Sequence, residues 1–316
     1  MKIVLLEPLA ISNDELHNLS SQLETMGHEF VAFDTVTKDT PSLIERAQGA
    51  DILMIANNPL NGEVIKAVEN LKYIAVAFTG VDHVDLETCR ARGIKVSNAQ
   101  GYATEAVAEL TVVMIISLLR NLIECDKVTR IEGTKAGLVG FELNGKTVGI
   151  VGTGAIGLRT AQLLKAFNCK LLGYSRSYSD QAEQLGIEYV SLEDLLANSD
   201  IVSLHVPLTE QTKGLINKET ISLMKKNSIL INVARGPVVD SEALAIALEN
   251  GIIAGAGIDV YEVEPPIPSN HPLLNAKNVL ATPHIAFATQ ESMLKRAEIV
   301  FDNVYGWLNG EEKNLV

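Results

Sequence analysis

The chain has 316 residues, of which 47% are hydrophobic, and a formal net charge of −13 at pH 7. This length and composition predict about two domains, each with a full hydrophobic core. The acidic balance argues against nucleic-acid binding, which requires a basic face, and against an anionic membrane surface. It still allows an anionic ligand, because a local arginine or a helix N-terminus can supply a positive field.

The first hundred residues alternate between strand-like and helical patterns. We expect strands at Lys2–Leu6, Glu29–Phe33, Asp51–Ile55, Tyr73–Ala77 and Lys95–Ser97. Helical patterns lie between them, near Asn13–Met26, Thr40–Gln48, Gly62–Glu69 and Leu86–Arg92. Alternation of this kind with apolar strands predicts a parallel sheet covered by helices on both faces.

A long helix of mostly apolar residues is expected at Thr104–Leu122. Such a helix must be buried in a core or a subunit interface. Its charge-free run, Leu110–Leu119, is too short to span a bilayer, and the N-terminus does not read as a signal peptide, so we expect no membrane segment. The three cysteines are widely spaced and form no C-x-x-C motif, which indicates free thiols in a reducing cytoplasm.

The strand Thr147–Val151 runs into three glycines, Gly152, Gly154 and Gly157, spaced G-x-G-x-x-G. The first allows a tight turn, the second lets a pyrophosphate approach the backbone, and the third lets the helix pack close to the strand. The helix beginning at Ala155 and Ile156 then offers free N–H groups to the phosphates. We expect Ile156, Leu163, Leu164 and Phe167 to form its apolar face. The motif, placed between a strand and a helix, predicts dinucleotide binding.

After this motif the alternation resumes. We expect strands at Lys170–Tyr174, Asp200–His205, Ser228–Val233, Gly255–Asp259 and Val279–Thr282, and a last helix near Thr289–Leu308. The expected fold is therefore α/β with two doubly wound parallel-sheet domains. A Rossmann cofactor domain (residues 100–285) interrupts a flavodoxin-like substrate domain (residues 1–99 and 286–316). Because ligands bind beyond the carboxyl ends of such strands, the active cleft is expected between the domains.

Several polar residues fall at these strand ends. His205 and His284 are rival proton donors, because histidine titrates near neutral pH, and position alone does not separate them. Arg235 could bind a ligand carboxylate through a bidentate pair of hydrogen bonds, or form an ordinary ion pair with a nearby Asp or Glu. Glu264 could orient a histidine, although a solvated loop carboxylate is the simpler interpretation.

The chain resembles the D-isomer-specific 2-hydroxyacid dehydrogenases over essentially its whole length. Besides the glycine motif, the matching segments are Thr79-Gly80-Val81-Asp82-His83-Val84-Asp85, Thr104-Glu105-Ala106-Val107-Ala108-Glu109-Leu110, His205-Val206-Pro207-Leu208-Thr209, Asn232-Val233-Ala234-Arg235-Gly236, Gly257-Ile258-Asp259-Val260-Tyr261-Glu262-Val263-Glu264-Pro265 and Thr282-Pro283-His284-Ile285-Ala286. Their order and spacing make the match specific.

The resemblance implies a role for each of these residues. His284 becomes the acid/base, Glu264 its partner, and Arg235 the group that holds the substrate carboxylate and carbonyl. The backbone N–H groups of Thr79 and Gly80 also hold the carboxylate, and Asp259 faces the nicotinamide carboxamide. The cofactor is further lined by His205, Val206, Pro207, Val233, Ala234 and Ala286, and Asn57 contributes to the substrate pocket. No metal is expected.

The same resemblance implies a homodimer with Thr104–Leu122 near its interface. The substrate is a small 2-oxo or D-2-hydroxy acid, with glyoxylate or hydroxypyruvate as the best guesses. The loop Ala56–Pro59 lacks the arginine of phosphoglycerate-specific relatives. The alternative is a non-enzymatic dinucleotide sensor like the C-terminal-binding corepressors, which share the fold and the residues.

The choice of cofactor rests on the segment Tyr174-Ser175-Arg176-Ser177. NAD-dependent proteins of this fold carry an acidic residue here for the ribose 2′-hydroxyl, whereas a nearby arginine accommodates a 2′-phosphate. We therefore expect Ser175, Arg176 and Ser177 to favour NADP. If Arg176 points to the adenine face or to solvent instead, NAD would serve as well.

Overall fold

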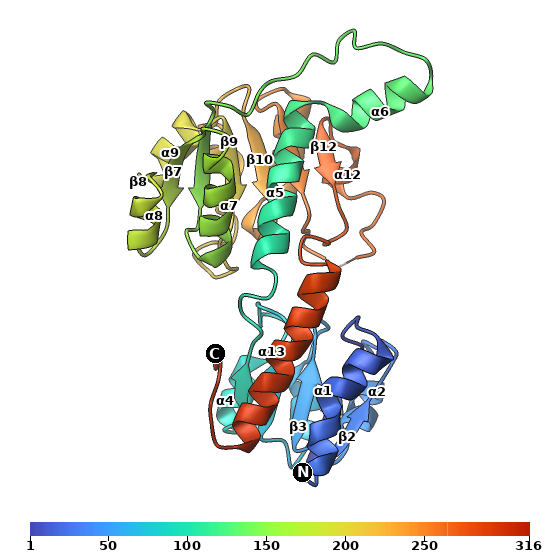
Figure 1. The fold of residues 1–316 in the computed structure, drawn as a ribbon. Helices are drawn as coiled ribbons and strands as arrows, with labels where there is room; N and C mark the ends of the chain where they lie inside the picture. The colour runs from blue at the N-terminus through green and yellow to red at the C-terminus, as the bar shows by residue number, and fades with distance from the viewer. Residues whose placement is uncertain (264) are drawn as a thin grey trace. The chain divides into compact units, whose positions relative to one another are not determined.

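The computed structural model describes residues 1–263 and 265–316, which divide into two compact units. Unit 1 comprises Met1–Ala103 and Ala288–Val316, and unit 2 comprises Thr104–Phe287 (Figure 1). The chain passes from one unit to the other after Ala103 and after Phe287, within a few residues of the boundaries expected from the sequence, after residues 99 and 285.

Unit 1 is built on a five-stranded parallel sheet in the order β2-β1-β3-β4-β5. The strands are β1 (Lys2–Leu5), β2 (Glu29–Ala32), β3 (Ile52–Ile55), β4 (Tyr73–Val76) and β5 (Lys95–Ser97). The helices are α1 (Asn13–Thr25), α2 (Thr40–Ala47), α3 (Gly62–Ala67), α4 (Leu86–Ala91) and α13 (Gln290–Leu308). This strand order is the flavodoxin-like one, as expected.

The last helix of the chain completes the core of unit 1. Val300, Phe301 and Val304 of α13 are buried in one cluster with residues of β1, β3 and β4. The ring of Trp307 stacks on that of Tyr73, with centroids 5.2 Å apart. Two segments distant in sequence therefore form one hydrophobic core.

Unit 2 contains a seven-stranded parallel sheet in the order β12-β11-β10-β9-β6-β7-β8. Its strands are β6 (Thr147–Val151), β7 (Lys170–Tyr174), β8 (Ile187–Tyr189), β9 (Ile201–Leu204), β10 (Ile229–Asn232), β11 (Gly255–Ile258) and β12 (Val279–Ala281). Its helices are α5 (Thr104–Leu119), α6 (Leu122–Arg130), α7 (Ala155–Lys165), α8 (Asp180–Gln184), α9 (Leu192–Asn198), α10 (Lys218–Ile221), α11 (Ser241–Glu249) and α12 (Pro272–Asn275), with a 3₁₀ turn at Gly236–Val238. Six neighbouring strands follow the Rossmann order, so the predicted fold class is confirmed. Each expected strand is present within a residue at either end, and only β8 was not expected.

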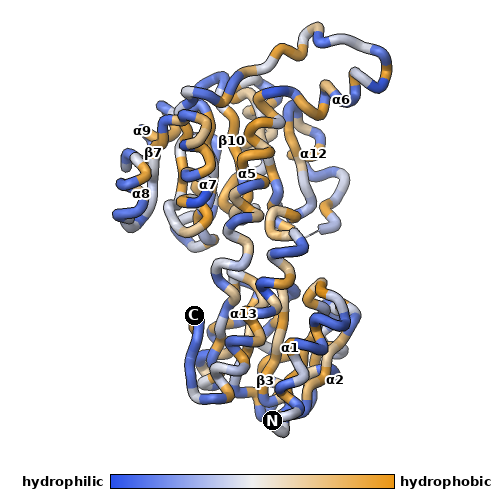
Figure 2. Tube along the Cα trace, viewed as in Figure 1, coloured by the Kyte–Doolittle hydropathy of each residue, from blue (hydrophilic) through white to orange (hydrophobic). Residues whose placement is uncertain are grey.

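The helix expected at Thr104–Leu122 is divided in two. The α5 helix ends at Leu119, and Asn121 takes a left-handed backbone (φ 52°) before α6 begins at Leu122. Asparagine adopts this conformation more easily than most residues, which explains the break. Most α5 residues are buried, and α5 packs on α7, β10 and β11 in unit 2; Figure 2 shows that much of it is hydrophobic.

Helix length and composition test whether the chain contains a membrane-spanning helix. No single helix in residues 1–263 and 265–316 is long and apolar enough to cross a membrane. The pair α5 and α6 passes the same test jointly, although the two helices are bent by 59° at their junction.

The glycine motif packs as its spacing requires. Gly152 has a left-handed φ of 98°, and a Cβ there would lie 2.7 Å from the carbonyl oxygen of His205. A Cβ on Gly157 would lie 2.0 Å from the carbonyl oxygen of Gly152. The buried face of α7 is Gly157, Thr160, Ala161 and Leu164. The expected contribution of Phe167 is wrong, because the helix ends before Phe167 and the ring is exposed.

Replacing Gly157 by alanine tests this packing. Alanine normally stabilises a helix by up to about 1 kcal/mol relative to glycine, but here the added methyl group meets backbone. We expect Gly157→Ala to lower the free energy of unfolding by roughly 1–3 kcal/mol. Gly154→Ala is the control, because a Cβ there has nothing within 4 Å. Equal unfolding midpoints for the two variants in urea would contradict the close approach.

Candidate functional site

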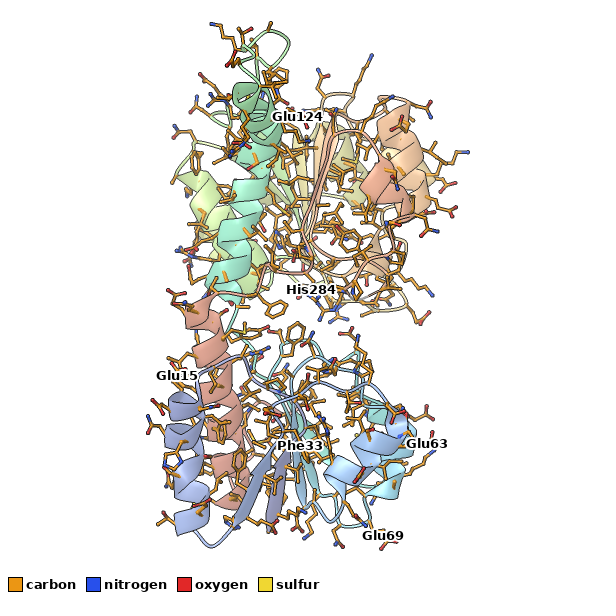
Figure 3. All side chains as sticks on the ribbon, turned by 90° about the vertical axis from the view of Figure 1, so that its right-hand side faces the viewer. Glu15, Phe33, Glu63, Glu69, Glu124 and His284 are labelled. Carbon is orange, nitrogen blue, oxygen red and sulfur yellow. The ribbon has the colours of Figure 1, made fainter. Side chains whose placement is uncertain are left out.

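Those residues singled out in unit 2 that the structure describes lie at one edge of its sheet. The glycine motif follows β6, Ser175–Ser177 follow β7, and His205–Pro207 follow β9. Val233–Arg235 follow β10, Asp259 follows β11, and His284–Ala286 follow β12. All strands are parallel, so these segments share the carboxyl edge, where ligands of open α/β sheets bind. Figure 3 labels His284 at this end of unit 2.

The turn that carries His284 is held by the fully buried side chain of Asp259. One carboxylate oxygen accepts hydrogen bonds from the Thr282 hydroxyl (2.6 Å) and the Ile285 N–H (2.8 Å). The other accepts from the Ala286 N–H (2.9 Å). The Asp259 carbonyl accepts from the His284 N–H (2.8 Å). This side chain therefore organises the histidine turn, a role that the sequence did not reveal.

The backbone of His284 is itself unusual. Its φ is 57°, in the left-handed region that non-glycine residues rarely adopt and that is common at functional sites. The imidazole is partly buried and meets the ring of Phe287 edge-on, with centroids 5.1 Å apart. The strained backbone of His284 therefore sets the direction of its side chain.

The turn that carries Arg235 is fixed by two contacts. The Asn232 side-chain amide donates to the Arg235 carbonyl (3.0 Å), and its oxygen accepts from the Ala234 N–H (3.1 Å). A Cβ on Gly236 would lie 1.9 Å from the carbonyl carbon of Tyr261. The arginine turn is therefore pressed against the segment that follows Asp259, and the loops of Arg235 and His284 lie at one edge of the sheet, on either side of the loop after β11.

Glu264 lies outside the described residues. The glutamate two positions before it, Glu262, is already engaged, since it accepts a hydrogen bond from His271 Nε2 (3.0 Å). These contacts, together with a hydrogen bond from Ser241, lower the pKa of Glu262 despite the opposing effect of burial. Glu262 is therefore committed to a local hydrogen bond.

The glycine motif forms a cradle that suits a dinucleotide phosphate. Gly154 caps α7 without a side-chain hydrogen bond to the first turn, and the space where its Cβ would lie is open to 4 Å. The N–H groups of this turn, which include those near Ala155 and Ile156, therefore face no capping side chain. The N-terminus of an 11-residue helix with open backbone beside it is the arrangement that binds pyrophosphate.

The loop after β7 is tied to this cradle by a residue that the sequence analysis did not identify, Tyr189. Its hydroxyl shares a hydrogen bond with Thr153 Oγ1 (2.7 Å) and accepts one from the Ser179 N–H (3.2 Å). Its ring also packs on Tyr178. Arg176 is exposed and forms no ion pair within the described chain. The only available signal for Tyr189 was its place at the end of β8, the strand that was not expected.

His205 is unsuited to proton donation. Its Nε2 pairs with Ser203 Oγ (2.9 Å), and its Nδ1 is buried without a partner among the described residues. Burial lowers its pKa to about 3, so the ring is neutral at pH 7. Of the two rival histidines, His284 thus remains the candidate acid.

Unit 1 holds the remaining candidates at its own carboxyl edge. Thr79 and Gly80 follow β4, and Asn57 follows β3. The loop of Asn57 is anchored by the buried Glu7, whose carboxylate accepts from the Ala56 N–H (2.8 Å) and the Asn58 N–H (3.2 Å). Burial raises the pKa of Glu7. The sequence analysis did not identify Glu7, although it is a polar residue near the end of β1.

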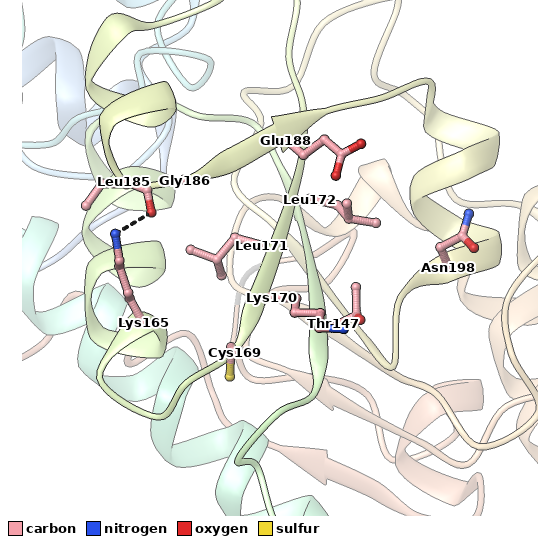
Figure 4. Close-up of a pocket in the computed structure, with 10 residues that line it drawn as sticks. All are labelled: Thr147, Lys165, Cys169, Lys170, Leu171, Leu172, Leu185, Gly186, Glu188 and Asn198. Atoms are coloured by element: carbon pink, nitrogen blue, oxygen red, sulfur yellow. Dashed lines mark hydrogen bonds between the residues drawn. The ribbon is translucent and has the colours of Figure 1, made fainter.

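A cavity of about 560 Å³ lies elsewhere in unit 2 (Figure 4). Its lining includes Thr147 and Lys170, the first residues of β6 and β7, and Lys165, whose Nζ donates to the Leu185 carbonyl (2.8 Å). It is therefore at the amino edge of the sheet. None of the candidate residues lines it, so it is not the cofactor site. No group of three metal-ligating side chains occurs in the part of the chain that is described.

The neutral state of folded His205 predicts how the free energy of unfolding changes as the pH falls. An unfolded histidine takes up a proton below pH 6.5, whereas folded His205 does so only near pH 3, so stability is lost as the pH falls through this window. We expect His205→Gln to reduce the loss in unfolding free energy between pH 7 and pH 5 by at most about 2 kcal/mol. The exposed His17, changed to Gln, is the control. Parallel pH profiles for wild type and His205→Gln in urea would show that the folded ring accepts a proton.

Comparison with known proteins places this geometry in a family. The model of the D-isomer specific 2-hydroxyacid dehydrogenase NAD binding domain matches residues 112–286. A glyoxylate reductase of Thermofilum pendens is 43% identical over 287 residues, covering 87% of this chain and 84% of that protein. A hydroxypyruvate reductase of Blautia hydrogenotrophica is 33% identical, covering 100% of this chain and 99% of that protein.

A solved structure agrees with this result. An acyclic imino acid reductase in complex with NADPH and D-Arg superposes with a TM-score of 0.89 at 27% identity, covering 100% of both chains. The family model covers more than half of the sequence, and the relatives extend the match over nearly all of it. The chain therefore belongs to the D-isomer specific 2-hydroxyacid dehydrogenases.

Proposed function

We propose that this protein reduces a small 2-oxo acid, glyoxylate or hydroxypyruvate, to the D-2-hydroxy acid with a nicotinamide cofactor. The observation that carries the proposal is the loop of His284, which Asp259 holds in a strained backbone at the same edge of the sheet as the loop of Arg235. The relatives named glyoxylate reductase and hydroxypyruvate reductase support this substrate class.

Each residue has a distinct chemical task in the proposal. Arg235 holds the substrate carboxylate and carbonyl, and the N–H groups of Thr79 and Gly80 also bind the carboxylate. When bound, the nicotinamide cofactor supplies the hydride for the carbonyl carbon. Protonated His284 gives its proton to the carbonyl oxygen, and Glu264 stabilises the imidazolium. Arg235 also stabilises the negative charge that develops on that oxygen.

The cofactor is proposed to bind along the carboxyl edge of unit 2. The α7 N-terminus and Gly154 would hold the pyrophosphate, as the open space at Gly154 supports. His205–Pro207, Val233, Ala234 and Ala286 would line the site, and Asp259 would face the carboxamide. The latter role for Asp259 comes in addition to its hydrogen bonds with the His284 turn.

A homodimer in the cytoplasm is also proposed. Apolar side chains of α6 and the loop after it are exposed, with Ile131 at 78% and Val139 at 81%, and α6 has no buried residue. Figure 1 shows this segment reaching away from the rest of unit 2. A second copy of the chain would cover these apolar groups. The three cysteines are unpaired, as thiols in a reducing compartment are.

Replacing His284 by alanine tests the proposed reaction. We expect turnover on a panel of 2-oxo acids to fall by about two to four powers of ten, since the general acid is lost, with nearly unchanged cofactor affinity. Steady-state kinetics and cofactor titration measure the two effects. His17→Ala, an exposed histidine of α1, should retain wild-type turnover. A wild type that binds cofactor but reduces no 2-oxo acid would instead favour the dinucleotide sensor.

The variant Arg235→Lys tests whether Arg235 binds the substrate carboxylate through bidentate hydrogen bonds or only through its positive charge. Lysine keeps the positive charge but lacks the planar fork, so kcat/KM for 2-oxo acids should fall by about tenfold or more while cofactor affinity changes little. Arg159→Lys is the matched control, because Arg159 forms an ordinary ion pair with Glu105 (2.8 Å). Similar small effects in both variants would assign Arg235 to an ion pair.

The loop after β7 is proposed to favour NADPH, because Ser175 does not repel a 2′-phosphate and the neighbouring Arg176 supplies a positive charge that could bind one. Wild type should show the higher kcat/KM with NADPH. Ser175→Asp combined with Arg176→Ala should favour NADH, and Arg90→Ala, an exposed arginine of α4, should leave the preference unchanged. A clear NADH preference in the wild type would show that Arg176 does not bind the 2′-phosphate and would contradict the proposal.

A further inference from the structure

The turn after β4 is held by hydrogen bonds from the residues that follow β5. The Ala99 N–H donates to the Phe78 carbonyl (2.9 Å), and the Asn98 side-chain amide donates to the Thr79 carbonyl (2.8 Å). Two successive peptide groups of the turn, Phe78–Thr79 and Thr79–Gly80, are therefore anchored through their carbonyl oxygens.

Anchoring these carbonyls fixes the direction of two N–H groups. In a trans peptide the carbonyl and the N–H point in opposite directions, so the Thr79 and Gly80 N–H groups face away from Asn98 and Ala99. Neither N–H has a hydrogen-bond partner among the residues that the structure describes. Thr79 is exposed and Gly80 partly so, which leaves both donors accessible to a ligand.

Asn98 is itself held by a chain of asparagines in unit 1. The Asn303 amide of α13 donates to the Asn98 carbonyl (2.9 Å), and the Asn314 amide donates to Asn303 Oδ1 (2.8 Å). The Asn98 N–H donates to the Asn314 carbonyl (3.0 Å). Asn303 is fully buried, so the backbone from which the Asn98 side chain extends is fixed by the core of unit 1.

The peptide that Asn98 holds is the one most free to rotate. Glycine tolerates backbone angles that other residues avoid, so the Thr79–Gly80 peptide could turn over with little steric cost. Water can reach the exposed turn and replace the lost donor to the Thr79 carbonyl. Losing the Asn98 amide would therefore cost little stability but would leave the Gly80 N–H without a fixed direction.

We propose that Asn98 is a positioning residue for substrate binding: it aims the Gly80 N–H at the substrate carboxylate and so makes the enzyme select 2-oxo acids over neutral carbonyl compounds. This inference rests on the proposed function, in which the Thr79 and Gly80 amides hold the carboxylate. It adds a residue that makes no contact with substrate and acts only through the Thr79 carbonyl.

The test compares Asn98→Ala with wild type on glyoxylate and on its uncharged methyl ester. We expect KM for glyoxylate to rise by about 10- to 100-fold, the usual effect of losing a hydrogen bond to a charged group, with little change for the ester. Cofactor affinity should stay within about twofold, since the pyrophosphate cradle is untouched. Asn98→Ser, which is too short to reach the Thr79 carbonyl, should behave in the same way and serves if the alanine variant does not fold.

Tyr73→Phe is the matched structural control. It removes a buried hydrogen bond between Tyr73 Oη and Ser97 Oγ (2.5 Å), one residue from Asn98, without touching the turn. It should lower the melting temperature at least as much as Asn98→Ala does but leave KM for glyoxylate unchanged. Equal losses on acid and ester, or a wild-type KM in Asn98→Ala, would overturn the inference alone. A wild type that reduces no 2-oxo acid would overturn the proposed function and the inference with it.

Discussion

One buried carboxyl group, that of Asp259, organises the candidate catalytic end of unit 2. A carboxyl group removed from water is costly unless its oxygens are hydrogen-bonded, and the loop after β12 supplies three donors to it. The same contacts hold His284 in a left-handed backbone that most residues avoid. The direction of the imidazole therefore depends on Asp259, although the two residues are 25 positions apart in the sequence.

Parallel pairing brings the other candidate groups to the same edge. Because every strand of unit 2 runs in one direction, the loops after β6, β7, β9, β10, β11 and β12 all emerge together. Close backbone packing then sets the distances between them: Gly236 allows the arginine turn to touch Tyr261, and Gly152 allows the glycine turn to touch the His205 carbonyl. These glycines act by lacking a side chain and contribute no chemistry of their own.

The loops proposed to bind cofactor and substrate are alike in one respect: each is held in place by hydrogen bonds from residues behind it. The hydroxyl of Tyr189 joins Thr153 of the glycine motif to Ser179 of the loop that carries Arg176. In unit 1, Glu7 anchors the loop of Asn57, and Asn98 anchors the turn of Thr79. A movement in one of these supports would shift a binding group without removing it, which is how a distant change can alter specificity.

The sequence by itself determined the fold class, the strand positions and the motif residues, because strand periodicity and glycine spacing are local properties of the chain. The rule that polar residues at strand ends are functional also identified Arg235 and His284, and the same rule applied to the first half would have identified Glu7 and Asn98. Only the tertiary structure decided that the long helix breaks at Asn121, that Phe167 is exposed, and that burial lowers the pKa of His205 to about 3. Only the tertiary structure, too, showed Tyr189 and Asp259 as supports. These features depend on hydrogen bonds and packing between segments that lie far apart in the sequence, so the order of the residues alone does not reveal them.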